Sequence, residues 1–222
     1  MKKLLRKWII FLCYLIGISP SVMSVETGDT TMIKTLCKPK TTGFVSVEEA
    51  ISKRRSIRTF KKIVLSEANI SQILWAAQGI TDSNMKFRSA PSAGATYPLD
   101  TYLFTSEGVY LYLPEEHAIK KLSVEDKRAK LSKAALNQSF IADAPLVILF
   151  VSVPERITKR YGTRGEQYIN IEAGHATQNI HLQAVALGLH SVPIGAFIDE
   201  QVAEIINLPH GYKPLYIIPV GM

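Results

Sequence analysis

The feature that most constrains the fold is the stretch from Gly165 to Leu189, which predicts one long helix with small and apolar residues nearly all round. The residues that give this character are Ile169, Ile171, Ala173, Ala176, Ile180, Leu182, Ala184, Ala186 and Leu187. A helix that is apolar on every side has to be buried. We therefore expect it to lie in the core and to pack against its twin in a dimer.

Four polar residues form a stripe on this predicted helix, at spacings of three and four: Glu172, His175, Asn179 and Gln183. Buried polar groups need hydrogen-bond partners. We favour the interpretation that the stripe ties the helix to neighbouring loops. The alternative is that Glu172 or His175 holds a loop of a binding site. The spacing offers no third ligand, so no metal site is predicted.

Two further helices are predicted from their capping residues. Ser46 and Glu49 have the spacing of a capping box, which starts a helix at Val47. Ser66 is placed to cap a second helix, which Gly79 ends.

The strand signals complete an α+β pattern without internal repeats. Segments 101–105 and 109–113 are typical of a hairpin, and a closing strand is expected over 214–220. The segment 146–153 is apolar without alternation, which predicts a strand covered on both faces. With 222 residues, 47% of them hydrophobic, the chain is long enough to bury the core of one domain.

The segment that follows the first predicted helix concentrates donors suited to a phosphate. Arg54, Ser56 and Arg58 supply two guanidinium groups and a hydroxyl within five residues. A guanidinium presents its donors in one plane and grips phosphate oxygens bidentately. Alone, such a short basic run is more often a solvated helix end.

Seven ordered segments resemble the nitroreductase superfamily, above all its SagB-type branch, and they span roughly residues 45–221. In order they are RRSIRTF, LSEANISQILWAAQGIT, PSAGATYPLD, APLVILFVSV, EAGHATQNIHLQAVALGL, VPIGAF and PLYIIPVG. The resemblance implies a central, mainly antiparallel sheet flanked by helices, and a homodimer with two FMN sites at the subunit interface. It also implies ping-pong electron transfer through flavin N5 to a nitro, quinone or related small-molecule acceptor, usually with NAD(P)H as the donor.

The same resemblance assigns cofactor-binding residues to three segments. For the phosphate it implies Arg54, Arg55, Ser56 and Arg58. The loop under the isoalloxazine ring resembles Pro91, Ser92, Ala93, Gly94 and Ala95, although many nitroreductases have Asn where this chain has Ala95. The loop whose backbone N–H groups meet flavin N5 and O4 resembles Pro193, Ile194, Gly195 and Ala196.

Tyr161 and Arg160 are the candidate catalytic residues. In the branch that oxidises azolines to azoles, a Lys-Tyr pair stands at this place, and here Arg160 replaces the lysine. An arginine stays protonated at physiological pH, so it stabilises negative charge but cannot act as a general base. Azole formation on a peptide, SagB-type azoline dehydrogenation, is therefore the alternative function. A catalytically idle flavin-binding protein is the other.

The first 24 residues predict an export signal. A basic region from Lys2 to Lys7 precedes an apolar run from Trp8 to Ile18, which is shorter than the roughly 20 residues needed to span a bilayer. Residues 25–44 are expected to be a poorly ordered lead-in that contains the lone thiol of Cys37, and 45–222 the FMN-binding domain. The alternative for 1–24 is an uncleaved anchor.

Charge and export bear on the partners. The net charge is +7, but four positive charges lie in residues 1–24, so 22 basic against 19 acidic residues remain without them. No nucleic-acid partner is predicted. An exported protein meets little NAD(P)H, so we expect a membrane quinol or a redox protein as the electron donor.

Overall fold

The computed structural model describes residues 32–222, and the predicted export signal lies outside this range. A seven-stranded sheet has the order β1-β6-β5-β4-β7-β9-β8, and every neighbouring pair of strands is antiparallel. Its strands are β1 (Ile33–Thr35), β4 (Leu99–Thr105), β5 (Gly108–Leu113), β6 (Ala118–Ser123), β7 (Leu146–Ser152), β8 (His190–Ser191) and β9 (Lys213–Gly221). A separate hairpin consists of β2 (Ile80–Asp82) and β3 (Phe87–Arg88). The α+β prediction with a mainly antiparallel sheet is confirmed.

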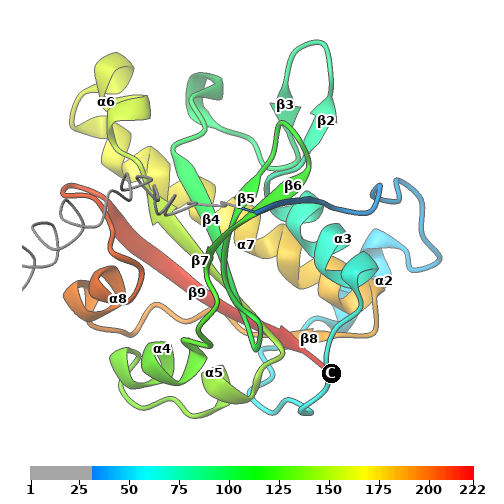
Figure 1. Ribbon diagram of the computed structural model, residues 1–222. Helices are drawn as coiled ribbons and strands as arrows, with labels where there is room; N and C mark the ends of the chain where they lie inside the picture. The colour runs from blue at the N-terminus through cyan, green and yellow to red at the C-terminus, as the bar shows by residue number, and fades with distance from the viewer. Residues whose placement is uncertain (1–31) are drawn as a thin grey trace, which may run out of the picture. The chain divides into compact units, whose positions relative to one another are not determined.

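Helices cover both faces of the sheet (Figure 1). They are α2 (Val47–Lys53), α3 (Glu67–Gln78), α4 (Arg128–Ala134), α5 (Phe140–Asp143), α6 (Glu155–Tyr161), α7 (Arg164–Ala186) and α8 (Asp199–Ile206), with a short 3₁₀ turn at Ala93–Ala95. One core cluster joins α3 and α7 to one face, and a second joins α4, α5 and α8 to the other. The strand β7 lies between the clusters and all seven of its residues are buried, as its unbroken apolar sequence predicts.

Both predicted helix caps are present. The Ser46 hydroxyl accepts a hydrogen bond from the Glu49 N–H at 3.1 Å, and the Ser66 hydroxyl accepts one from the Asn69 N–H at 3.2 Å. These bonds satisfy N–H groups that have no partner inside the helix. The caps therefore start α2 and α3 at the predicted residues.

The lead-in differs from the expectation of poor order in its described part. Residues 33–35 form β1, which pairs with β6 at the edge of the sheet, and Leu36 is buried. The Ser71 hydroxyl donates to the carbonyl oxygen of Cys37. Backbone pairing with β6 orders this segment although the side chains of β1 are exposed.

The helix α7 forms where it is predicted but buries only one side within this chain. Ile169, Ala176 and Ile180 are buried against α3 and the sheet, whereas Ile171 is 46% exposed. The expectation of burial on every side therefore does not hold within one chain. In residues 32–222 no helix is both long and apolar enough to cross a membrane.

Candidate functional site

The basic segment after α2 lies beside the strand that leads into the 193–196 loop. Arg54 ends α2, and Ser56 forms an isolated parallel bridge with Ser191 of β8. The N–H of Ile57 donates to the Ser191 carbonyl oxygen at 3.2 Å. Two segments that are more than 130 residues apart in the sequence are thus held together by backbone hydrogen bonds.

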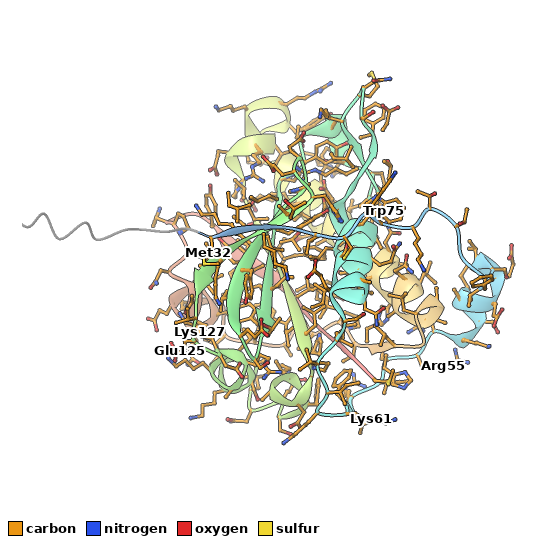
Figure 2. The ribbon with its side chains drawn as sticks, turned by 45° about the vertical axis from the view of Figure 1, so that its right-hand side comes forward. Met32, Arg55, Lys61, Trp75, Glu125 and Lys127 are labelled. Atoms are coloured by element: carbon orange, nitrogen blue, oxygen red, sulfur yellow. The ribbon has the colours of Figure 1, made fainter. Side chains whose placement is uncertain are left out.

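The arginines of this segment are not all available to a ligand. Within the described residues, Arg54, Arg55 and Arg58 form no ion pair with a carboxylate. The guanidinium of Arg55, however, donates to the carbonyl oxygens of Ser52 and Arg54, at 3.0 and 2.7 Å. It serves the last carbonyl groups of α2, and Figure 2 shows it at the outer end of that helix. Arg54, Ser56 and Arg58 remain as the donor set.

The 193–196 loop presents backbone N–H groups without partners. Ile194 exchanges both of its backbone hydrogen bonds with Ile217, at 2.8 and 3.0 Å, which fixes the loop on β9. The N–H groups of Gly195 and Ala196 donate no hydrogen bond within residues 32–222. Gly195 is exposed, and the nearest atom to an added Cβ would be the Tyr216 ring at 3.7 Å. A ligand edge can therefore approach this backbone closely.

The loop at 91–95 meets the two candidate catalytic residues. Gly94 has a φ of +60°, and its carbonyl oxygen accepts a hydrogen bond from Arg160 Nη1 at 3.2 Å. A Cβ on Gly94 would lie 2.6 Å from Arg160 Nη1 and 2.7 Å from the Tyr161 hydroxyl oxygen. The absence of a side chain at Gly94 thus makes room for both. The Ser92 hydroxyl accepts from the N–H of Tyr97 at 2.9 Å, which closes the loop.

The 91–95 loop with Tyr161 and the basic segment with the 193–196 loop lie beside different parts of α7. Glu172 is next to Ser92, whereas Nδ1 of His181 lies 2.8 Å from the Ser191 hydroxyl oxygen. His181 is nine positions after Glu172 on the helix, a rise of about 13.5 Å. Within one chain, the basic segment with the 193–196 loop and the 91–95 loop with Tyr161 therefore do not form one pocket.

Both buried ionisable residues of α7 have displaced pKa values. Burial raises the pKa of Glu172 to about 7, and the neighbouring Ser92, Gln78 and Arg88 oppose this effect. Burial and, as the smaller cause, the nearby positive charge of Arg54 lower the pKa of His181 to about 4. Near neutral pH, Glu172 is thus partly protonated and His181 is a neutral imidazole.

The four residues of the polar stripe on α7 have different partners in the structure. The amide of Asn179 donates to the Ser89 carbonyl oxygen at 3.2 Å, and Gln183 accepts from the Gln72 amide at 3.1 Å. These two residues tie the helix to its neighbours, as predicted. His175 is exposed, so Glu172 is the member of the stripe that lies at the 91–95 loop. Sequence reasoning missed His181, because a single histidine on an apolar helix face carries no signal.

Two cavities lie away from the basic segment and the 193–196 loop. One, of about 540 Å³, lies between residues 62–65, the start of α3 and the β4–β5 hairpin. The other, of about 350 Å³, is lined by Arg88, Tyr97 and Thr101. No group of three or more potential metal ligands occurs in the described residues.

Comparisons with known proteins agree with this architecture. Residues 51–222 match the model of the nitroreductase family. The protein MJ1384 of Methanocaldococcus jannaschii, provisionally named a nitroreductase, is 42% identical over 183 residues, which are 80% of this chain and 91% of that one. A crystal structure from Ralstonia eutropha, also provisionally named a nitroreductase, superposes with a TM-score of 0.79 at 28% identity, covering 87% of this chain and 90% of that one.

A more distant relative is the microcin B17-processing protein McbC of Escherichia coli. It is 25% identical over 155 residues, which are 65% of this chain and 57% of McbC. McbC represents the SagB-type branch, so the similarity to that branch is confirmed. Proteins of the nitroreductase family typically bind FMN and are usually dimeric. Since the family match covers most of the sequence and the fold agrees, the chain belongs to the nitroreductase family.

Proposed function

We propose that the protein is a homodimeric FMN-dependent oxidoreductase that passes electrons through flavin N5 to a nitro, quinone or related small-molecule acceptor. The observation that carries this proposal is the backbone pairing of Ser56 and Ile57 with Ser191. It brings the phosphate donors Arg54, Ser56 and Arg58 next to the loop of Gly195 and Ala196. A phosphate-binding segment beside free backbone donors suits the two ends of a flavin mononucleotide.

The separation of the two clusters along α7 supports a site shared between two chains. In a two-fold dimer with the exposed sides of α7 packed antiparallel, the Glu172 region of one chain lies near the His181 region of the other. The 91–95 loop of one chain would then complete the site that Arg54, Ser56 and Gly195 begin in its twin. The exposed Ile171, and the exposed Phe44, Val47 and Ile51 around α2, are apolar surface suited to such an interface.

FMN, when bound, supplies reversible two-electron chemistry at its N5 atom. The residues of this chain would hold and shield it. Arg54, Ser56 and Arg58 bind the phosphate, and the N–H groups of Gly195 and Ala196 stabilise negative charge at the ring edge. Tyr161 and Arg160 border the acceptor, since both lie at Gly94. Arg160 provides a fixed positive charge there, and Tyr161 a hydroxyl donor.

Azoline dehydrogenation on a peptide is the second candidate function, favoured by the similarity to McbC. Arg160, which replaces the lysine of that branch, cannot remove a proton from a substrate carbon. In the test, wild type and Arg160→Lys are both assayed for azoline oxidation. Activity in the variant but not in the wild type would assign this chain to acceptor reduction. Azoline oxidation by the wild type itself would reverse the ranking.

The electron donor follows from the predicted export. We propose that residues 1–24 direct the protein out of the cytoplasm and that a membrane quinol or a redox protein reduces it there. Rapid, selective reduction of the purified protein by low concentrations of NADPH would contradict the donor. Recovery of the full-length chain in the cytoplasmic fraction would contradict the export.

The first experiment is the visible spectrum of the purified 25–222 chain before and after release of bound chromophore by heat. We expect about one FMN per chain. The variant Arg54→Gln should lose affinity for FMN but not for riboflavin, which lacks the phosphate, and Arg55→Gln is the matched control because Arg55 serves α2. A colourless protein that does not bind added FMN contradicts the proposed function.

A further inference from the structure

Glu172 is a buried carboxyl group whose hydrogen bonds are incomplete. Glu172 is 2% exposed, and the side chains of Ser92 and Gln78 lie beside its carboxyl group, although neither carboxyl oxygen receives a well-formed hydrogen bond within the described residues. Leaving such a group unpaired in the interior is unfavourable. Groups whose surroundings displace their pKa in this way cluster at functional sites.

The groups around Glu172 come from three other elements. Ser92 of the 91–95 loop and Gln78 at the end of α3 are its polar neighbours, and Arg88 of β3 is the charge that favours its ionised form. Arg88 Nη1 donates to Gln78 Oε1 at 3.1 Å, and its guanidinium lies 4.5 Å from the centre of the Tyr97 ring. Arg88 is itself half-buried and is repelled by Arg156, which pairs with Asp100 at 2.8 Å. Arg88 therefore contacts Gln78 and Tyr97 and forms no ion pair with Glu172 within the described residues.

Ser92 connects this carboxyl group to the candidate redox site. The Ser92 oxygen already accepts from the Tyr97 N–H, so its own hydrogen is free to be donated, and Glu172 is the acceptor beside it. Two residues further on, Gly94 contacts Arg160 and Tyr161.

A second connection runs through the aromatic rings. Tyr168, one helical turn before Glu172 on α7, packs edge to face on Tyr161 with ring centres 5.2 Å apart. Glu172 is therefore connected to the 91–95 loop through Ser92, and to Tyr161 through Tyr168 on the same helix.

We propose that Glu172 is a positioning residue that holds the 91–95 loop through Ser92 and takes up one proton whenever the bound cofactor is reduced. Two electrons from the quinol or redox-protein donor bring two negative charges into the site. One of these charges would be offset by a proton at the cofactor, and a proton from solvent on the Glu172 carboxylate would offset the other. When the electrons leave to the acceptor, both protons leave with them, so the site returns to its starting charge.

The electrostatics suit this role. Because burial raises the pKa of Glu172 to about 7, the carboxyl group both gains and loses a proton near neutral pH. Arg160 cannot do so, since arginine keeps its proton. Glu172 thus provides the titrating group that the Lys-to-Arg change at position 160 removes from the neighbourhood of Tyr161.

The test measures proton uptake on reduction, and it rests on the proposed function because it uses the FMN-loaded protein. Wild type and Glu172→Gln are reduced with dithionite at about pH 7.5 in weak buffer that contains a pH indicator, and the midpoint potential is followed between pH 6 and pH 8. We expect Glu172→Gln to bind FMN, to take up about one proton fewer per two electrons, and to have a potential that falls less steeply with pH. At pH 6 the two potentials should nearly coincide.

Two further variants separate this role from general packing. Glu172→Asp keeps a titrating carboxyl group and should restore the additional proton, whereas Glu166→Gln, an exposed change on the same helix, should behave as wild type. Equal proton uptake in wild type and Glu172→Gln overturns the inference and leaves the proposed function intact. A wild-type chain that holds no FMN overturns both.

Discussion

Protonation of His181 is expected to oppose folding at acidic pH. The residue is 4% exposed on α7, and its Nδ1 atom is 2.8 Å from the Ser191 hydroxyl oxygen. Burial and the charge of Arg54 lower the pKa of His181 from 6.5 to about 4. The unfolded chain therefore binds a proton at this histidine more readily than the folded chain does, and the contribution of His181 to the free energy of unfolding falls as pH drops from 6.5 towards 4.

The magnitude follows from the two pKa values. A displacement of 2.5 units corresponds to about 3.4 kcal/mol once the pH is well below 4. At pH 5 the folded histidine is still mostly neutral while the unfolded one is charged, which amounts to about 2 kcal/mol. Against a total stability of roughly 5–15 kcal/mol, this effect is measurable.

The assay is urea unfolding of the cofactor-free chain at pH 7 and pH 5, in buffer without phosphate. His181→Gln retains a polar partner for Ser191 but does not titrate, so its stability change between the two pH values should differ from that of wild type by about 2 kcal/mol. His175→Gln, an exposed change on the same helix, is the matched control. If wild type and His181→Gln change by the same amount, the imidazole is not held neutral by the fold and the reasoning is refuted.

Three further changes test other parts of the structure. Glu172→Gln should stabilise the chain relative to wild type by about 2.5 kcal/mol more at pH 8 than at pH 5, because it removes the buried charge; an equal difference at both pH values in urea unfolding would contradict the raised pKa. Ser66→Ala should lower the unfolding free energy by about 1 kcal/mol through loss of the α3 cap, and no change would mean that the Asn69 N–H finds another acceptor. Gly94→Ala places a Cβ against Arg160 and Tyr161 at a φ of +60°; we expect a loss of about 1 kcal/mol and weaker FMN binding in a fluorescence titration, whereas unchanged FMN affinity would exclude this loop from the cofactor site.

Local signals in the sequence predict most of the fold because they act over a few residues. The Ser46 and Ser66 caps need only the next three positions, and the burial of β7 follows from its own apolar run. The strand β1 is missed because its three exposed residues gain their order from β6, more than 80 residues away. No pattern within 33–35 contains that information.

The site divides in the same way. The sequence identifies the segments, but the pairing of Ser56 with Ser191 and the meeting of Gly94 with Arg160 depend on the tertiary structure. Arg55 is assigned to the phosphate by its place in the motif, whereas its guanidinium serves the end of α2. Glu172 is one of four equivalent polar residues in the stripe until the structure shows which of them is buried beside Ser92.

Glu172 and His181 have opposite effects on stability, and the two nearly cancel. The contribution of Glu172 to the free energy of unfolding is lost as pH rises from 4.5 to 7, because the fold raises the pKa of Glu172 from 4.5 to about 7. The contribution of His181 is lost as pH falls from 6.5 to 4. The displacements are equal in size and overlap in range, so their summed penalty stays within about 0.5 kcal/mol between pH 4 and pH 8. A free energy of unfolding that hardly changes with pH in wild type therefore does not mean that α7 lacks titrating groups. Each single variant should reveal the dependence of the other residue, with Glu172→Gln losing stability towards acid and His181→Gln losing it towards base, and the double variant should again be flat.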